Sequence, residues 1–403
     1  ALGSDTLGHK SVAVGRGSLA TQNFTTATDS LNTAVGYFSG NAITTGTNNT
    51  LIGGEAGDAL TTGASNVAIG YNTLSADTKG ARSVAIGRDA LLSQNFTTAT
   101  NAINVAVGDR SGDAITTGIE NTLIGGSSGS GLQDADFNVA VGASALTADT
   151  LGSRSVAIGT SALQTQNFTT ATNTLNTAVG FQAGKAITTG IQNTLIGGQA
   201  GDALTDADFN TALGVIALGS DTLGSHNTAL GHGTLSVQNF TTATNAYNTA
   251  VGSQAGTAVT TGTENTFIGG QAGDAITTGS FNVAVGAAAL SADTLGSRNT
   301  AVGLQALAKQ NFTTATDSYN TGIGFFAGVE ITTGVQNTLI GGLAGDAITD
   351  ADRNVGLGYN ALTTNTVGSR SVAIGTSALS VQNPATATDM YNVAVGDDCG
   401  KLI

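Results

Sequence analysis

A five-residue motif recurs through the whole chain and constrains the fold more than any other feature. It is first complete as Ser11-Val12-Ala13-Val14-Gly15 and last as Asn392-Val393-Ala394-Val395-Gly396, with 22 copies in all. One 21-residue step between copies is followed by three 17-residue steps, and this 72-residue cycle repeats without slippage. Because so short a unit cannot bury an apolar face alone, the period predicts a solenoid of stacked coils.

The motif itself predicts a short β-strand. It is too short and too rich in β-branched residues for a helix, and no 3.6-residue apolar period runs through it. Its fourth residue is Val, Ile or Leu in every copy, and its second is always Val or Thr. We expect these two positions to share a face and to fill the core. The third residue, which is usually Ala, then points to the opposite face.

The remainder of each coil predicts a return path and a polar ladder. Apolar pairs such as Ala90-Leu91 and Ala114-Ile115 indicate a second strand. Segments such as Thr44-Thr45-Gly46 predict turns, because Gly takes a positive φ at no steric cost. The residue that opens each motif is Asn or Ser, and we expect these side chains to stack and to form hydrogen bonds along the axis.

These patterns predict an all-β fold, a parallel β-solenoid of the β-roll type. It has about 22 coils, each a 17-residue unit except for one 21-residue coil in each 72-residue cycle. Residues 1–403 are expected to form a single elongated segment of five full cycles plus partial ends, because the pattern never changes to that of another domain. Both termini fall within a coil, so we expect the chain to be a segment of a longer protein.

The composition excludes several classes of function. Charged residues make up 10% of the chain and the formal net charge is -14, whereas nucleic acid and anionic lipid attract basic surfaces. No apolar run is long enough to span a bilayer, so we expect no direct membrane insertion. The single cysteine, Cys399, cannot form an internal disulfide. Stability therefore has to come from the stacking of coils.

Charge follows the 72-residue cycle and not the 17-residue step. A basic residue or His precedes the first motif of each cycle, and an Asp or Asn stands five residues earlier. The pairs are Asp5 with Lys10, Asp77 with Arg82, Asp149 with Arg154, Asp221 with His226, Asp293 with Arg298, and Asn365 with Arg370. We expect each pair to meet across one turn. One pair per cycle spaces like charges about 19 Å apart, beyond the Debye length.

The first coil of each cycle carries four extra residues, in segment 22–28 and its equivalents. An insertion in every fourth coil predicts a row of exposed loops, and exposed irregular segments are where partners bind. The candidate contact residues are the triplets Asn23, Phe24, Thr25; Asn95, Phe96, Thr97; Asn167, Phe168, Thr169; Asn239, Phe240, Thr241; and Asn311, Phe312, Thr313. The same triplets match the acceptor pattern for N-glycosylation.

Two acidic clusters are candidates for calcium. Their carboxylates are close enough in sequence to gather a hard cation at a turn. The residues are Asp202, Asp206, Asp208, Asp346, Asp350 and Asp352. Other cycles replace this cluster with Thr-Thr-Gly, so a solvated turn is favoured and no cofactor is expected. Calcium-dependent melting would favour the metal site.

No constellation of catalytic residues recurs along the chain. The three histidines, His9, His226 and His232, do not repeat as a set, and no nucleophile and base share a repeated position. Enzymes need such groups brought together with defined geometry. We therefore expect a protein that is not an enzyme.

The motif Ser83-Val84-Ala85-Ile86-Gly87 and its Asn-Thr-Ala-Val-Gly variants carry a resemblance to a known family. They resemble the head repeats of YadA-type trimeric autotransporter adhesins, and are similar to repeats in phage tail fibres and bacterial surface fibres. The resemblance implies a left-handed β-roll, three chains side by side, and an extracellular location on a cell surface or virion. It also implies that Ala13, Ala34, Ala68 and Ala85 are small residues at which neighbouring chains approach each other.

Two functions of different kind follow from these observations. The first is a non-enzymatic extracellular fibre, an adhesin head, shaft or surface filament, that associates with itself and presents its loops to a surface receptor or matrix of unknown identity. The alternative is an ice-binding solenoid, indicated by Thr columns such as Thr44, Thr61 and Thr78. Thermal hysteresis in dilute solution would favour the alternative, and a homotrimeric mass would favour the fibre.

Overall fold

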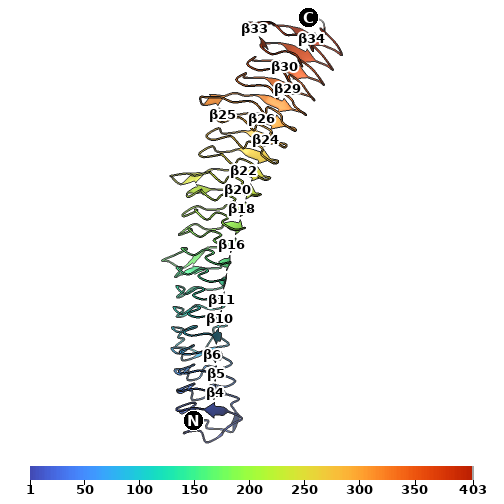
Figure 1. The fold of residues 1–403 in the computed structure, drawn as a ribbon. Helices are drawn as coiled ribbons and strands as arrows, with labels where there is room; N and C mark the ends of the chain where they lie inside the picture. Colours follow the sequence, from blue (N-terminus) through green and yellow to red (C-terminus); the bar gives the residue numbers. More distant parts are fainter. Residues whose placement is uncertain (402–403) are drawn as a thin grey trace. The chain divides into compact units, whose positions relative to one another are not determined.

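The computed structural model describes residues 1–401. Residues 402–403, at which the sequence predicts that the chain stops within a coil, lie outside the described part. The described chain contains β-strands and turns but no helix, and so no helix able to cross a membrane. It forms two compact units, Ala1–Asp206 and Ala207–Ile403. Each unit is a stack of similar coils (Figure 1).

One three-residue strand per coil is formed by the second to fourth residues of the motif. In the first unit these strands are β2 (Val12–Val14), β4 (Thr33–Val35), β5 (Thr50–Ile52), β6 (Val67–Ile69), β8 (Val84–Ile86), β10 (Val105–Val107), β11 (Thr122–Ile124), β12 (Val139–Val141), β14 (Val156–Ile158), β16 (Thr177–Val179) and β17 (Thr194–Ile196). In the second unit they are β18 (Thr211–Leu213), β20 (Thr228–Leu230), β22 (Thr249–Val251), β23 (Thr266–Ile268), β24 (Val283–Val285), β26 (Thr300–Val302), β28 (Thr321–Ile323), β29 (Thr338–Ile340), β30 (Val355–Leu357), β32 (Val372–Ile374) and β34 (Val393–Val395).

Within each unit, successive strands pair in parallel with their motifs in register. Ala34 of β4 lies opposite Leu51 of β5, and Leu51 lies opposite Ala68 of β6. In the second unit Ala250 of β22 lies opposite Phe267 of β23 in the same way. A register in which every motif meets the next is what a sequence repeat of fixed length dictates. The predicted parallel β-solenoid is therefore confirmed.

The core lies on the opposite side of the strand from the one predicted. The third residue is fully buried in nearly every strand, as at Ala34, Leu51 and Phe267. The second and fourth residues, such as Val67 and Ile69, are only partly buried. The prediction that these two positions fill the core is wrong. The reason is that each coil is thin, so its interior accepts a small residue or one large residue per level, while the β-branched residues face outward.

The rest of the core comes from turns and not from a second strand. Leu91 is fully buried but lies in a turn with a φ of 50°. Ile115 is also fully buried outside any strand. The predicted second strand at Ala90-Leu91 and Ala114-Ile115 is therefore wrong. The backbone at these positions turns too tightly to extend, and it satisfies its polar groups by hydrogen bonds to the next coil, as from Leu91 N to the carbonyl of Ser111 (3.1 Å).

The Gly that closes the motif is required by the stacking of coils. Gly36 has a φ of 145°, in the region that L side chains rarely adopt. A Cβ at this position would collide with the carbonyl group of Gly53 in the next coil. Any other residue here would therefore push neighbouring coils apart.

The predicted polar ladder runs through the inside of the stack. The side-chain oxygen of Asn32 accepts a hydrogen bond from the backbone N–H of Asn49 (2.9 Å), and that of Asn49 accepts one from Asn66 (3.0 Å). Each Asn also spans its own coil, since Asn49 Nδ2 donates to the carbonyl of Gly63 (2.9 Å). These Asn side chains are fully buried. They satisfy buried backbone groups at each level and so fix the register.

Short two-residue strands mark where the 21-residue coil meets its neighbour. Each pairs in parallel with the equivalent segment of the coil before it. The pairs are β1 (Gly8–His9) with β3 (Thr28–Asp29), β7 (Gly80–Ala81) with β9 (Thr100–Asn101), β13 (Gly152–Ser153) with β15 (Thr172–Asn173), β19 (Gly224–Ser225) with β21 (Thr244–Asn245), β25 (Gly296–Ser297) with β27 (Thr316–Asp317), and β31 (Gly368–Ser369) with β33 (Thr388–Asp389). The inserted residues are thus tied to the stack.

Candidate functional site

The main surface feature of each unit is an uncharged sheet surface of Val, Ile, Leu and Thr side chains, which we call the outer sheet face. It consists of the second and fourth residues of the motifs. The fourth residue is aliphatic in every copy, and no charged residue occupies either position. Ile52, Ile268 and Leu213 are 38%, 40% and 44% exposed. A column of aliphatic fourth residues beside uncharged Val and Thr, on a chain with 10% charged residues, indicates an interaction surface.

Two columns of residues border the outer sheet face. The pre-strand column consists of the residue immediately before each motif, and the post-strand column of the residue immediately after its Gly. Pre-strand residues adopt a left-handed backbone, with φ of 64° at Arg82 and 60° at Phe137. This conformation costs a non-Gly residue about 1–2 kcal/mol. It turns the chain into the strand and leaves the pre-strand side chain at the surface, as at Phe137, which is 41% exposed.

Three arginines of the pre-strand column, Arg154, Arg298 and Arg370, contact rings from neighbouring coils, and Arg298 does so on both sides. The guanidinium of Arg298 lies 4.8 Å from the ring centre of Phe281 and 5.8 Å from that of Tyr319. Where His226 replaces Arg, its ring stacks on Phe209 and Tyr247 with centroid distances of 4.8 and 4.9 Å. The cation–ring contacts stabilise by about 0.5–1 kcal/mol at exposed sites.

The predicted pairing of these cations with the preceding Asp is wrong. Arg298 instead pairs with Asp317 in the next coil (3.2 Å), and Lys10 with Asp29 (2.7 Å). The Asp that stands five residues earlier is buried, as at Asp77. Its carboxylate faces inward and accepts a hydrogen bond from the backbone of the inserted loop.

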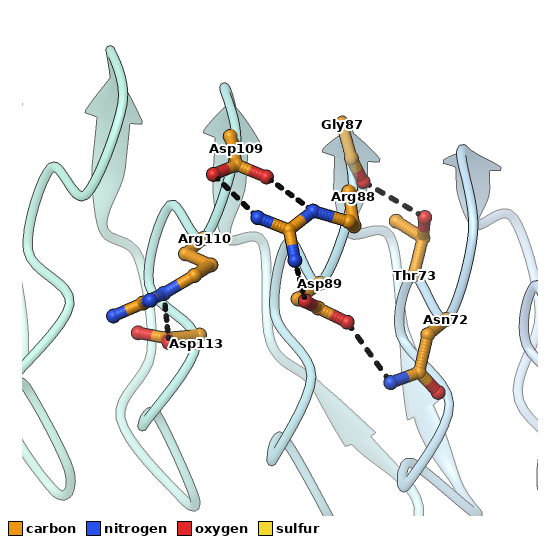
Figure 2. A network of polar contacts seen from close by, with 8 residues as sticks. All are labelled: Asn72, Thr73, Gly87, Arg88, Asp89, Asp109, Arg110 and Asp113. Carbon is orange, nitrogen blue, oxygen red and sulfur yellow. Dashed lines mark hydrogen bonds and ion pairs between the residues drawn. The ribbon is translucent and has the colours of Figure 1, made fainter.

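The post-strand column carries a run of polar contacts in the first unit. Figure 2 shows Arg88 donating two hydrogen bonds to Asp109, from Nε to Oδ1 (2.8 Å) and from Nη2 to Oδ2 (2.9 Å). Next to it, Asp89 accepts a hydrogen bond from Nδ2 of Asn72 (2.9 Å) and lies 3.4 Å from Nη1 of Arg88. Arg88 and Asp109 are more than half exposed, so their pairing contributes little to stability.

The inserted loops are anchored by their Phe residues, which the sequence predicted to contact a partner. Phe96 is 6% exposed and its four equivalents are similarly buried. Its backbone N–H donates to Asp77 Oδ1 (3.2 Å), and Gln94 Nε2 donates to Asp77 Oδ2 (2.7 Å). The prediction of Phe24, Phe96, Phe168, Phe240 and Phe312 as contact residues is therefore wrong, because these rings fill the stack. The flanking Asn and Thr residues of the triplets are exposed.

The four alanines that were expected to separate neighbouring chains lie inside their own coils. Ala34, Ala68 and Ala85 are fully buried, and Ala13 is partly buried. The prediction that they lie on a face open to other chains is wrong, since the third strand position points into the core. The positions left open to other chains are the second and fourth.

The candidate calcium ligands do not gather around one point. Thr363 Oγ1 donates to Asp346 (2.5 Å), whereas the backbone N–H of Val335 donates to Asp352 (2.8 Å). Asp350 accepts from Oγ1 of its neighbour Thr349 (3.1 Å). Asp206, of the other cluster, accepts from Thr189 Oγ1 (2.6 Å). In residues 1–401 no group of three His, Cys, Asp or Glu side chains is placed to hold a metal ion.

Partly buried aspartates occupy one position of the third coil. Burial raises the pKa of Asp58, with the nearby Glu55 adding to the effect, and burial also raises the pKa of Asp274. In the described chain, Oδ1 of Asp58 and Oδ1 of Asp274 are buried and accept no hydrogen bond. These carboxylates therefore oppose folding while they are ionised.

The hydroxyls of the Thr column that suggested ice binding form hydrogen bonds within the stack. Thr44 Oγ1 donates to the carbonyl of Thr61 (3.2 Å), and Thr61 Oγ1 donates to that of Thr78 (2.9 Å). Thr78 Oγ1 in turn donates to the carbonyl of Phe96 (2.8 Å). The hydroxyl hydrogens of this column are thus directed along the axis.

Sequence reasoning missed the outer sheet face, although a signal for it was present. The second and fourth motif positions never carry charge, which is unusual for a surface that faces water. No family model and no curated protein matches the chain. The surface of the solenoid itself therefore provides the indications of function.

Proposed function

We propose that this chain is a non-enzymatic structural fibre that associates with parallel copies of itself through the outer sheet face. The observation that carries the proposal is the uncharged outer surface of the strands, which is aliphatic at the fourth motif position and Val or Thr at the second, and is partly exposed in the single chain. Withdrawing half of a Val or Ile side chain from water contributes about 1 kcal/mol per strand. Because the contribution repeats with every coil, the free energy of association grows with the number of coils in contact.

Three chains around a common axis is the arrangement that we favour. The resemblance of the motif to trimeric adhesin head repeats supports this number, and three chains around one axis can each turn the outer sheet face inward. The net charge of -14 opposes close approach of identical chains. The absence of charge from the outer sheet face removes that opposition where the chains meet.

The proposed setting is extracellular, on a cell surface or a virion, where such a fibre attaches to a receptor or matrix. The exposed tips of the inserted loops, including Asn23 and Thr25, recur once per cycle. Regular repetition of one weak contact raises attachment strength by avidity. The proposal needs no cofactor.

The test is the mass of the native particle, compared between two matched variants. Ile52→Lys with Ile268→Lys places two charges on the outer sheet face. Thr62→Lys with Thr278→Lys places the same charges in the same coils on exposed turns, at the position that Lys79 holds in another coil. We expect the wild type and the Thr variant to show three chains by light scattering, and the Ile variant to show one. A single-chain wild type at micromolar concentration contradicts the proposal.

A further inference from the structure

The pre-strand column of the second unit alternates aromatic rings with other side chains. From one coil to the next its residues are Phe209, His226, Tyr247, Glu264, Phe281, Arg298, Tyr319 and Gln336. Every second level of this segment is a ring, and the levels between the rings hold His, Glu, Arg and Gln. The Glu is the unexpected residue, because the face of an aromatic ring carries partial negative charge and attracts cations.

The level of Arg298 shows which groups surround a cation in this column. Its guanidinium lies 4.8 Å from the ring centre of Phe281 and 5.8 Å from that of Tyr319. Its Nε lies 3.2 Å from a carboxylate oxygen of Asp317. A planar cation therefore fits between two rings that are two coils apart, with a carboxylate at its edge.

The level of Glu264 has the same two rings and a carboxylate. The backbone N–H of Glu264 donates to the carbonyl of Ala246 (2.8 Å), and that of Phe281 donates to the carbonyl of Thr263 (3.1 Å), so these coils are consecutive. Tyr247, Glu264 and Phe281 have φ of 51°, 57° and 61°, and their side chains therefore leave the backbone in the same direction. Two strand spacings place the two rings about 9.6 Å apart.

One face of each ring is directed at the level of Glu264. His226 stacks on the face of Tyr247 toward the preceding coil, and Arg298 lies over the face of Phe281 toward the following coil. The opposite faces of the two rings therefore point toward each other across Glu264. Tyr247 and Phe281 are 52% and 42% exposed, and Glu264 is exposed as well. The salt bridges found in residues 1–401 do not include Glu264.

We infer that Tyr247, Glu264 and Phe281 form a binding site for the guanidinium group of an Arg side chain from a protein or peptide partner. The long side chain of Glu264 has several rotamers at the surface, so its carboxylate can accept hydrogen bonds from the edge of a guanidinium that enters between the rings. The ring faces then cover both sides of the guanidinium plane. The net charge of -14 attracts a basic partner.

The site distinguishes Arg from Lys. An ammonium group has neither flat faces for the two rings nor a planar set of donors for the carboxylate. All three residues of the site belong to one chain and lie outside the outer sheet face. The inference therefore does not depend on self-association.

Fluorine NMR of the full chain, labelled with 3-fluorotyrosine, tests the site. The chain has six tyrosines, and Tyr247→Phe identifies the signal of Tyr247. We expect N-acetylarginine amide to cause a saturable shift of this signal and none of the Tyr71 signal. Half-saturation should need about fivefold less of this probe than of N-acetyllysine amide, because only Arg offers the planar fork.

Glu264→Gln removes the charge of the site and keeps the size of the side chain. We expect it to raise the half-saturating concentration of the arginine probe by about fivefold, because hydrogen bonds to a charged acceptor are the stronger ones. Glu120→Gln is the matched control and should leave that concentration unchanged. Glu120 holds the same position in the first unit, where Ile103 takes the place of one ring and Phe137 supplies the other.

Ile103→Tyr should create a second site at Glu120. Ile103, Glu120 and Phe137 have φ of 53°, 57° and 60°, as at the first site, and Ile103 is 43% exposed. We expect a seventh fluorotyrosine signal that shifts with the arginine probe over the same concentrations as Tyr247. A new signal that does not shift, in a chain whose β-sheet circular dichroism is unchanged, would overturn the inference.

The remaining outcomes are equally decisive. Equal half-saturation for the arginine probe and for N-acetyllysine amide or tetramethylammonium would show a general attraction of cations and overturn the guanidinium site. An unchanged affinity in Glu264→Gln would do the same. A wild type that is a single chain in solution and still shows the Arg-selective shift at Tyr247 supports this inference while it contradicts self-association.

Discussion

At the scale of single residues, hydrogen-bond partners come from the equivalent positions of the coils before and after. Asn49 takes one partner from each direction, since its N–H bonds Asn32 and its side-chain oxygen bonds the N–H of Asn66. The aspartates of the third coil are the exception. Asp58 and Asp274 each leave one buried oxygen without a hydrogen-bond partner in the described chain. These buried carboxylates are therefore the groups at which we expect pH to change the free energy of unfolding.

Acidification is expected to increase the contribution of these aspartates to stability. Burial raises the pKa of Asp58 and Asp274 above the unfolded value of 3.8. Their contribution is fully present below about pH 3.8 and is lost as the pH rises through the folded pKa. Asp58→Asn with Asp274→Asn should therefore reduce the gain in melting temperature between pH 7 and pH 4.5. An unchanged gain would show that other groups cause it. Asp109→Asn, at an exposed ion pair, is the control.

Adjacent strand residues point to opposite sides, so substitutions at them should change the free energy of unfolding by different amounts. Ala157 is fully buried, as is Leu163 of the same coil, so Ala157→Leu should overpack the coil and cost about 1–3 kcal/mol. Val156→Thr changes a half-buried residue to one found at the same position in other coils, and should change the free energy of unfolding by less than about 0.5 kcal/mol. Urea unfolding measures both. Equal costs would contradict the assigned facing.

At the scale of elements, the residues inserted in the long coil pack into the core of the stack. The four extra residues of the long coil do not hang free, because Phe168 is 7% exposed and its N–H donates to the buried Asp149 (3.1 Å). The added strand β15 then pairs with β13 of the preceding coil. A loop held at three points presents its exposed tip in a fixed orientation.

Removing the anchor should release the loop. Phe168→Ala deletes a buried ring, a change that costs about 3–5 kcal/mol in protein cores. We expect amide hydrogen exchange at Thr172 and Asn173 to become faster, while exchange in β12 is unchanged. Thr169→Ala, at the exposed neighbouring residue, is the control and should leave exchange as in the wild type. Uniform loosening of all strands would indicate that the loop is not an independent element.

At the scale of the molecule, the outer sheet face links stability to association. A single chain leaves two residues of every strand partly in water, and an assembled fibre covers them. If the folded chain associates and the unfolded chain does not, mass action stabilises the fold. The melting temperature of the wild type should therefore rise with chain concentration. That of Ile52→Lys with Ile268→Lys should not, and a constant wild-type melting temperature would contradict the proposal.

The repeat in the sequence predicted the solenoid, the parallel register and the internal Asn ladder, because a regular repeat permits only one way for every motif to meet its neighbour. It did not determine which side of the strand is buried. In Val67-Ala68-Ile69 all three residues are apolar, so alternation alone does not distinguish the inside from the outside. The packing of the coils settles which side is buried, since the thin interior accepts Ala and excludes two β-branched residues at each level.

The contacts of Phe96, Asp77 and Arg298 also depend on the tertiary structure. Each partner lies in an adjacent coil, whereas the sequence predicted that Asp77 pairs with Arg82, that Arg298 pairs with Asp293, and that Phe96 is exposed to a partner. Stacking brings residues one coil apart closer together than residues across a turn. The contacts that anchor the loops and order the edges therefore follow from the separation of coils and not from neighbours in sequence.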